Sequence, residues 1–240
     1  MNKTDLINSF AELGENLKQI PESTLQLAKT KNQWFTIDFI KLAANNWAKA
    51  LTHDNIEKWL TDETFEPNQK NVGVIMAGNI PFVGLHDLLS ILAQGMNAQV
   101  KLSSNDEVLM KYCIDILTTI QPEFASMITS DGKFVNLSYL IATGSNNSAR
   151  YFEYYFKNTS TLIRKNRTSL AVLSGKESEQ ELELLANDIY TYFGLGCRNV
   201  THLILPRNFE LKPLYEAYDK YMDHVHHHKY YNNYIYHKSI

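Results

Sequence analysis

From residue 71 onward, short apolar runs alternate with amphipathic stretches, and this alternation restricts the fold more than any other feature of the chain. The first run, residues 72–77, is apolar throughout, as strands buried on both faces are. Residues 78–81 form a turn, and Pro81 suits the first turn of a helix because its missing N–H is not needed there. Strand–helix units in series predict a parallel sheet with helices on its faces. We therefore expect an α/β fold.

The same alternation continues to the end of the chain. We expect strands at 72–77, 99–102, 139–143, 170–173 and 201–205, with helices at 85–95, 108–120, 146–155, 182–193 and 209–222. Ser104 with Glu107 and Ser178 with Glu181 have the spacing of capping boxes at two helix starts. Residues 1–70 have helical periodicity and contain all three tryptophans, which predicts a helical cap. We therefore expect this helical region at 1–70, followed by the α/β part of the chain.

Charge and cysteine content exclude several classes of protein. The 240 residues carry a formal net charge of -3 and no long basic run, which argues against nucleic acid or an anionic membrane as the main partner. No apolar run approaches the ~20 residues that cross a bilayer. Cys113 and Cys197 lack the spacing of a zinc site, and two thiols in a chain of this length suggest a reducing compartment. We expect a cytoplasmic protein.

A histidine cluster lies close to the end of the chain, at His224, His226, His227 and His228. Histidine is a common metal ligand, but adjacent histidines on one element cannot all face one ion. We favour a polar, aromatic helix surface and predict no metal site.

Cys197 lies in the small-residue segment 194–199, directly after a predicted helix. A thiolate there can attack a carbonyl carbon while backbone N–H groups stabilise the oxyanion. The alternative is a small buried hydrophobic residue, since free cysteine is among the most buried residue types.

Two loops, 78–81 and 144–147, leave predicted strands and enter helices. Ligands of doubly wound sheets bind at such loops, where helix N-termini offer free N–H groups to phosphates. Each loop alone is also explained by a well-capped helix. Lys101 closes a strand and can donate to a ribose or a phosphate, although a solvated lysine is the commoner case.

In combination, these segments resemble the aldehyde dehydrogenase superfamily, and within it the fatty acyl-CoA reductases of the bioluminescence type. Four segments carry the resemblance, in the order of the family: 74–81 with its Asn-Ile-Pro, 100–104 at a strand end, the Gly-Ser loop of 143–150, and 192–200 around the cysteine. The resemblance implies an aldehyde-dehydrogenase-like α/β fold. It divides the chain into a helical N-terminal region at 1–70, a nucleotide-binding domain with a Rossmann-type parallel sheet at 71–163, and a partial α/β catalytic domain at 164–240.

The resemblance also implies a role for each matching residue. Cys197 would carry the acyl group as a thioester, and Asn79 with the Cys197 backbone N–H would form the oxyanion hole. The implied cofactor contacts are Ala77, Gly78, Lys101, Ser103, Ser104, Gly144, Ser145, Asn146 and Asn147. Ser104 stands where many NAD-preferring relatives carry an acidic residue that repels a 2′-phosphate. The expected cofactor is therefore NADPH, with NADH as the alternative.

Two departures from the family pattern refine the prediction. Residues 164–169 contain no carboxylate where hydrolytic relatives carry a water-activating glutamate, which favours reduction of a thioester over its hydrolysis. Arg164, Lys165 and Arg167 in this stretch are expected either to contact phosphates of CoA or to form a solvated basic turn. The chain ends soon after Cys197, so we expect a C-terminally truncated relative whose activity is uncertain.

The sequence as a whole predicts NADPH-dependent reduction of a long-chain fatty acyl-CoA to an aldehyde through a cysteine thioester. A non-catalytic nucleotide-binding fragment and a cysteine acyltransferase or thioesterase are the alternatives. His86 and His202 are candidate proton donors because they neighbour the motif segments. The expected partners are the acyl thioester substrate and either a second copy of the chain or an acyl-transfer protein.

Overall fold

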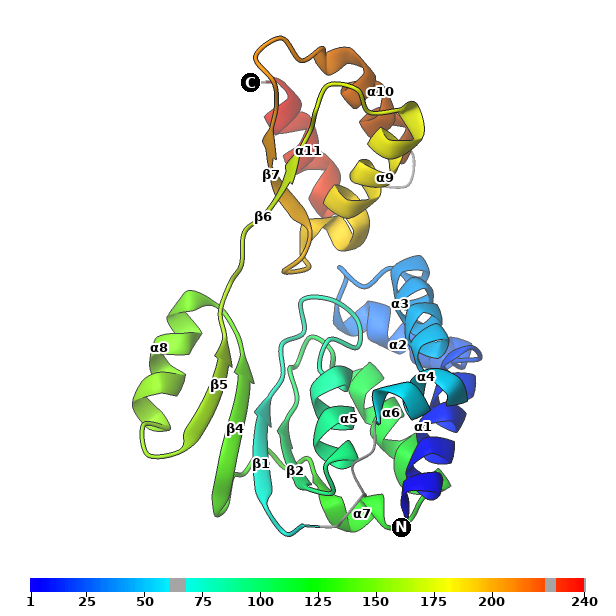
Figure 1. The fold of residues 1–240 in the computed structure, drawn as a ribbon, viewed down its shortest axis with the longest axis vertical. Coiled ribbons are helices and arrows are strands. Elements are labelled where there is room, and N and C mark those ends of the chain that lie inside the picture. Colours follow the sequence, from blue (N-terminus) through cyan, green and yellow to red (C-terminus); the bar gives the residue numbers. More distant parts are fainter. Residues whose placement is uncertain (61–67, 223–227, 240) are drawn as a thin grey trace. The chain divides into compact units, whose positions relative to one another are not determined.

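The computed structural model describes residues 1–60, 68–222 and 228–239 (Figure 1). The chain divides into two compact units, Met1–Asn166 and Arg167–Ile240, and each is described by itself. No helix in the described ranges is long and apolar enough to cross a membrane. The cytoplasmic location and the three-domain division at 1–70, 71–163 and 164–240 stay predictions.

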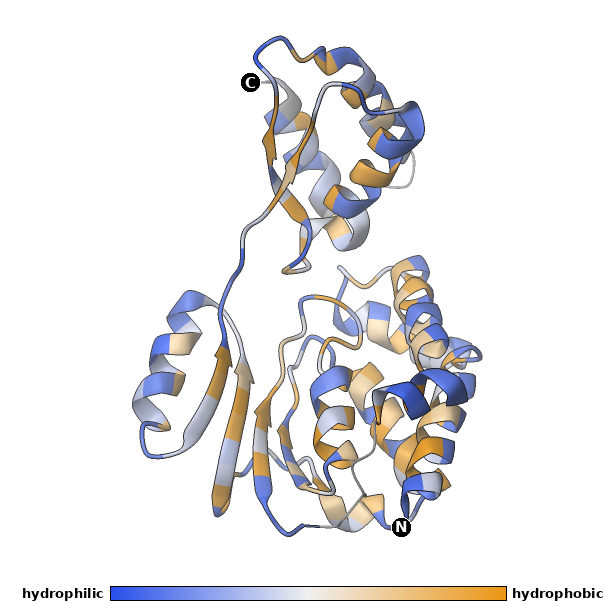
Figure 2. Ribbon diagram, viewed as in Figure 1, coloured by the Kyte–Doolittle hydropathy of each residue, from blue (hydrophilic) through white to orange (hydrophobic). Residues whose placement is uncertain are grey.

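A five-stranded sheet forms the centre of the first unit, in the order β3-β2-β1-β4-β5. Its strands are β1 (Asn71–Ile75), β2 (Asn97–Lys101), β3 (Ile128–Thr129), β4 (Leu137–Thr143) and β5 (Ser160–Arg164). Every neighbouring pair is parallel, which confirms the predicted α/β fold. The three middle residues of β1 are buried. Figure 2 shows that hydrophobic residues occur along the strands of this sheet.

Helices cover both faces of this sheet. The connections are α5 (Leu85–Ala93), α6 (Glu107–Ile120), α7 (Phe124–Met127) and α8 (Asn146–Tyr155). Because β2 and β5 lie on opposite sides of the β1–β4 pair, right-handed crossovers place α5 and α8 on opposite faces, as Figure 1 shows. The direction of winding reverses between β1 and β4, so the loops after these two strands lie where such sheets bind ligands.

The N-terminal residues form the predicted helical cap. Its helices are α1 (Lys3–Leu17), α2 (Glu22–Lys31), α3 (Ile37–Ala50) and α4 (His53–Trp59). Two hydrogen bonds connect the cap to the region of α6: Tyr112 Oη donates to the Asn16 carbonyl over 3.4 Å, and Asn32 Nδ2 donates to the Asn105 carbonyl over 3.3 Å. Trp59 lies at the edge of this packing, with its ring centroid 6.5 Å from that of Phe10.

The second unit contains a two-stranded parallel sheet packed against helices. Its elements are β6 (Ser169–Val172), α9 (Glu179–Tyr190), the 3-10 turn η1 (Thr191–Gly194), β7 (Val200–Ile204), α10 (Leu211–Met222) and α11 (His228–Ser239). Leu173, Leu182, Ala186, Leu214 and Ala217 form most of its buried apolar core. His224, His226 and His227 lie outside the described residues, as does the side chain of His228. No group of metal-ligating side chains is found in the part of the chain that the structure describes.

Three details of the predicted elements were wrong or missing. Ser104 does not cap α6, because Asp106 occupies that position after a turn in which the Asp106 N–H donates to the Ser103 carbonyl over 3.1 Å. The helix expected at 182–193 ends at Tyr190, and the chain continues in a left-handed turn. Strands β3 and β5 were not predicted. The other capping box, Ser178 with Glu181, is present as expected.

Candidate active site

The loops after β1 and β2 pack directly against each other. A Cβ added to Gly78 would lie 2.4 Å from Ser103 Oγ, so only glycine fits this contact. Lys101 ends β2 with an exposed side chain, and its carbonyl accepts the Met76 N–H over 3.1 Å. Ala77 is partly buried, whereas Ser104 is exposed. The structure thus brings the predicted residues of these two loops together at the carboxyl ends of the central strands.

The loop after β4 opens into a capped helix. The Ser145 side chain accepts the Ser148 N–H over 3.2 Å, and Gly144 N–H donates to the Arg164 carbonyl over 3.1 Å. Asn146 and Asn147 are exposed in the first turn of α8, where backbone N–H groups have no partner within the helix. A helix N-terminus of this kind can accept a phosphate. The same geometry also satisfies the simpler expectation of a well-capped helix.

Asn79 belongs to a loop that is strained and tightly packed. Phe82, three residues further on, has a φ of 59° and is completely buried, although non-glycine residues rarely adopt such a φ. The Asp106 carboxyl group lies buried beside this loop. The backbone N–H groups of Phe82 and Val83 lie near it but form no well-aligned hydrogen bond with either of its oxygens. Burial raises the Asp106 pKa well above its usual range, and the backbone N–H groups of Phe82 and Val83 offset this only in part.

Arg164 forms an ion pair with a buried carboxylate. Its guanidinium Nη1 donates to both carboxylate oxygens of Asp87 on α5, at 2.6 and 2.7 Å. Asp87 is 5% exposed, so this ion pair connects the last residue of β5 to a buried carboxylate on α5. Lys165 is also paired, with Glu153 at 2.6 Å. The expectation of a solvated turn was therefore wrong for Arg164, whereas Lys165 and Arg167 are exposed after β5. Contact of these residues with phosphates stays a prediction.

In the second unit, Cys197 follows a turn with an unusual backbone. Tyr192, Phe193 and Gly194 have φ values of 55°, 56° and 70°, and strained non-glycine residues of this kind cluster at functional sites. Cys197 itself is exposed, which excludes the alternative of a buried hydrophobic residue. Its backbone N–H has no hydrogen-bond partner among the described residues. The segment therefore offers a thiol and, on the same residue, a free N–H donor.

The two cysteines differ sharply in their surroundings. Cys113 is buried inside α6, and its burial together with the neighbouring Asp106 raises the pKa of its thiol well above the ordinary value. A buried thiol of raised pKa is a poor nucleophile. Of the two thiols, only Cys197 is accessible to a substrate.

A residue that was not assigned a role from the sequence, Asn199, holds the cysteine segment. Its side-chain oxygen accepts the Gly196 N–H over 2.8 Å, and its amide nitrogen donates to the carbonyls of Asp188 and Thr191 over 2.9 and 3.0 Å. These contacts connect the turn before Cys197 to the end of α9. The sequence signal was only an asparagine beside a predicted turn, a position where asparagine is common.

The predicted site residues are divided between the two units. Asn79 and the proposed cofactor contacts belong to Met1–Asn166, whereas Cys197 belongs to Arg167–Ile240. The candidate proton donors are divided in the same way. His86 lies 3.6 Å from Asp87 in the first unit, and His202 contacts the Thr201 hydroxyl at 3.1 Å in the second. Both histidine roles stay predictions.

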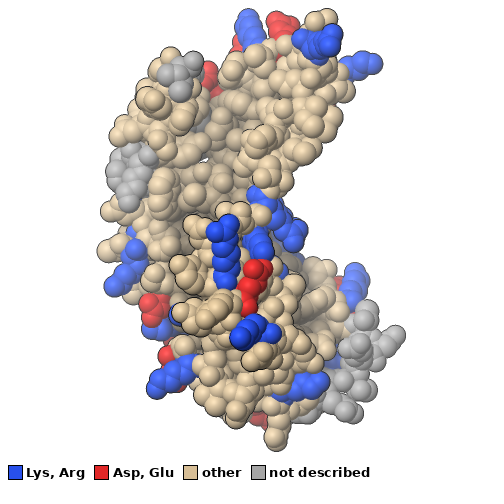
Figure 3. Space-filling view, turned by 90° about the vertical axis from the view of Figure 1, so that its left-hand side faces the viewer, with Lys and Arg blue, Asp and Glu red and all other residues tan. Residues whose placement is uncertain are grey.

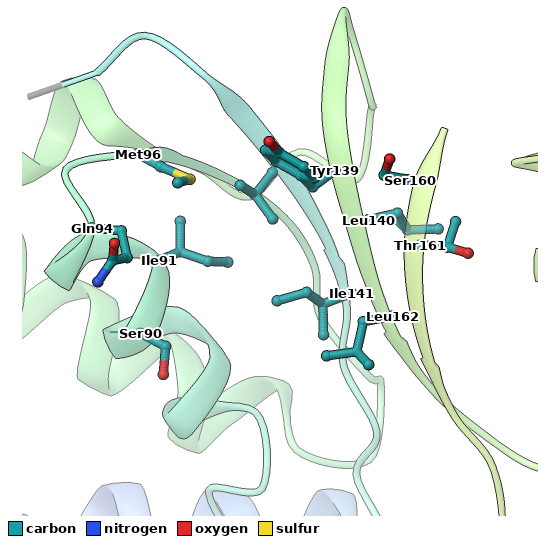
Figure 4. Close-up of a pocket in the computed structure, with 11 residues that line it drawn as sticks. Ser90, Ile91, Gln94, Met96, Tyr139, Leu140, Ile141, Ser160, Thr161 and Leu162 are labelled. Carbon is teal, nitrogen blue, oxygen red and sulfur yellow. The ribbon is translucent and has the colours of Figure 1, made fainter. Parts of the chain in front are cut away.

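A separate cavity of about 460 Å³ lies on the α5 face of β4 and β5 (Figure 4). Ile91, Ile141 and Leu162 point into it, and its lining is predominantly apolar. None of the residues predicted for the cofactor or the nucleophile lines this cavity.

On the face seen in Figure 3, acidic side chains lie among the basic ones, so that face carries no continuous basic surface.

No family model matches the sequence, and no curated protein matches it either. Solved structures do match. The NAD+ complex of an aldehyde dehydrogenase from Bacillus cereus is 15% identical over 93% of this chain, with a TM-score of 0.67. A NAD-dependent benzaldehyde dehydrogenase from Corynebacterium glutamicum is 14% identical over 90%, with a TM-score of 0.72. A cysteine-to-alanine mutant of propionaldehyde dehydrogenase from a Clostridium phytofermentans microcompartment is 10% identical over 92%, also with a TM-score of 0.72.

The fold is that of the aldehyde dehydrogenases. This confirms the fold expected from the ordered motifs, at identities too low to show more than fold. The chain covers 50%, 54% and 56% of these three structures, so it spans about half of their length. The narrower resemblance to bioluminescence-type acyl-CoA reductases stays a prediction.

Proposed function

We propose that the chain belongs to an enzyme that reduces an acyl thioester to an aldehyde through a thioester on Cys197. The observation that carries the proposal is the exposed Cys197 thiol, whose own backbone N–H is free among the described residues and follows a strained turn. Acyl transfer needs a nucleophile and an oxyanion donor within reach of one carbonyl group, and this residue offers both. The aldehyde-dehydrogenase fold is consistent with that chemistry.

In the proposed reaction, the Cys197 thiolate attacks the carbonyl carbon of an acyl-CoA. The Cys197 N–H stabilises the oxyanion, a role that the resemblance also gives to the Asn79 side-chain amide, and the C–S bond to CoA breaks so that CoA leaves as a thiol. A reduced nicotinamide, when bound, would supply the hydride that reduces the thioester carbonyl to an aldehyde. The Cys197 sulfur then leaves the carbon as a thiolate, and the net reaction consumes acyl-CoA, NADPH and a proton and yields aldehyde, NADP+ and CoA.

The residues of the first unit fit a nicotinamide dinucleotide. Gly78 has no Cβ where the loops after β1 and β2 meet, and the first turn of α8 presents free N–H groups at the neighbouring strand end. In this proposal Lys101, Ser103 and Ser104 bind the adenosine ribose, and Gly144 to Asn147 bind the nicotinamide side and the pyrophosphate. Ser104 is exposed and neutral, so it would not repel a 2′-phosphate. NADPH is the proposed cofactor and NADH the alternative.

The end of β5 supports reduction rather than hydrolysis. A water-activating base must hold a proton with a pKa near the working pH. Asp87 pairs with Arg164 at this strand end, and burial raises its pKa while hydrogen bonds from His86 and Arg164 lower it, with a net decrease. A carboxylate so stabilised as an anion is a weak base. The acyl-enzyme is therefore expected to persist until hydride reaches it.

A single-turnover experiment tests the proposal. The purified chain is mixed with acyl-CoA of increasing chain length and then with NADPH or NADH, and the aldehyde is trapped as a hydrazone and identified by mass spectrometry. We expect aldehyde that depends on both Cys197 and the cofactor, with long chains and NADPH preferred. Thioester without aldehyde would favour an acyltransferase, and cofactor binding without thioester would favour a nucleotide-binding module.

A further inference from the structure

We infer that Asn199 is a positioning residue for Cys197: its side chain fixes the peptide segment so that the Cys197 backbone N–H faces the acyl carbonyl group. The inference rests on the proposed function, because it assigns a purpose to that N–H in acyl transfer. It concerns a residue that touches neither substrate nor cofactor and acts through its hydrogen bonds to the backbone.

The three hydrogen bonds of Asn199 require both functions of an amide side chain. The oxygen accepts the Gly196 N–H over 2.8 Å, and the nitrogen donates to the carbonyls of Asp188 and Thr191. The last carbonyls of a helix lack partners within it, and here the Asn199 amide supplies one after α9 ends at Tyr190. Aspartate cannot donate these bonds, and alanine can form none of them.

The contacts hold the cysteine segment on both sides. On one side, Gly196 is held by the Asn199 side chain, and the Asn199 N–H donates back to the Gly196 carbonyl over 3.0 Å. On the other side, the Ser169 hydroxyl of β6 lies 3.5 Å from the Cys197 carbonyl. The N–H of Cys197 is left without a partner among the described residues. That donor is the one an oxyanion needs.

The left-handed turn before Cys197 needs stabilising contacts of this kind. Tyr192 and Phe193 hold φ values of 55° and 56°, which are unfavourable for residues with a side chain. Strain of this kind persists only where surrounding contacts fix it. Without the Asn199 contacts, we expect the segment from Tyr192 to Gly196 to relax and to turn the Cys197 N–H away from its present direction.

The experiment compares Asn199→Ala and Asn199→Asp with the control Asn187→Ala, which removes an exposed asparagine side chain from α9 of the same unit. Two rates are measured on each protein: alkylation of Cys197 by iodoacetamide, which needs only the thiol, and acylation by a long-chain acyl-CoA, which also needs the oxyanion donor. Misplaced catalytic groups cost on the order of 10- to 100-fold. We expect acylation to fall by about that factor in both Asn199 variants, with alkylation changed less than about twofold.

Hydrogen exchange of the Gly196 amide keeps the test independent of activity. We expect faster exchange in both variants: alanine cannot accept the Gly196 N–H, and aspartate cannot hold the end of α9. Asn187→Ala should leave exchange unchanged. The inference is overturned if alkylation and acylation fall together, if acylation is unchanged, or if Gly196 exchange matches the control. A wild-type chain that takes up no acyl group would overturn the proposed function instead, and the exchange result would still decide the positioning.

Discussion

At the scale of residues, two buried carboxyl groups near the loop after β1 show opposite behaviour. Burial raises the pKa of both, but at Asp87 the hydrogen bonds from His86 and Arg164 outweigh it and leave the pKa below its usual 3.8. At Asp106 burial dominates, because only the N–H groups of Phe82 and Val83 act against it. Asp87 therefore stays charged in the folded protein, whereas the charged form of Asp106 lowers the free energy of unfolding.

Replacing Arg164 should destabilise the first unit. Arg164→Met leaves the Asp87 charge buried and unpaired, which typically costs 3–5 kcal/mol. Because Arg164 is 35% exposed, we expect about 2 kcal/mol. The folded pKa of Asp87 is lowered, so this contribution is present above its unfolded pKa and is lost as the pH falls through the folded value. Urea denaturation measures it, and Lys165→Met, which breaks an exposed pair, should cost less than ~0.5 kcal/mol. Equal losses in the two variants would contradict the assignment.

Replacing Asp106 should have the opposite pH dependence. The folded pKa is raised above 3.8, so the wild type loses stability as the pH rises from that value to the folded pKa. Asp106→Asn removes this titration, and the difference in melting temperature between variant and wild type should rise across the same window. The buried Cys113 thiol faces the same carboxyl group and is unchanged in the variant. Asp115→Asn, an exposed change on the same helix, should show no such trend. A flat difference for Asp106→Asn would contradict the account.

At the scale of elements, the sequence predicted the helices and strands whose signals come from neighbouring residues. The apolar run of β1 and the Ser178–Glu181 box depend on residues close in the chain, and both are present. Strand β5 was missed because its residues are exposed or half-buried and three of the five are polar or charged, so no apolar pattern marks it. The Ser104 cap failed because the turn from Ser103 to Asp106 competes with it.

The contact between the loops after β1 and β2 gives a prediction at this scale. Gly78→Ala places a Cβ 2.4 Å from Ser103 Oγ, and overpacking of this kind typically costs about 1–3 kcal/mol. Ser103→Gly removes the opposing atoms, so the double variant should recover part of that loss. Thermal melts of the four proteins give the coupling energy. Strictly additive effects would show that the two loops do not press against each other.

At the scale of the whole molecule, the order of motifs along the chain predicted the fold, and the roles of the candidate site residues stay predictions. It could not predict the Arg164–Asp87 pair or the Asn199 contacts. Arg164 and Asp87 are distant in sequence, and Asn199 depends on where α9 ends. The exposure that separates Cys197 from Cys113 likewise follows from packing and not from spacing.

The division into two units predicts separable binding and chemistry. All proposed cofactor contacts lie in Met1–Asn166, and the nucleophile lies in Arg167–Ile240. A fragment of residues 1–166 contains all of these contacts, so it should bind the reduced nicotinamide with an affinity within about threefold of the whole chain. Calorimetry measures this, and a threefold change corresponds to about 0.7 kcal/mol of binding free energy. It should not be alkylated at a fast-reacting thiol. Loss of binding in a folded fragment would show that the second unit contributes cofactor contacts.

The most direct test of the central claim is the intact mass of the chain after reaction with a long-chain acyl-CoA. The wild type and Cys113→Ser should gain one acyl group that hydroxylamine removes, and Cys197→Ser should gain none. A hydroxylamine-labile acyl group that persists on Cys197→Ser, or a wild type that gains no mass while cofactor still binds, would contradict the assignment of Cys197 as the acyl carrier.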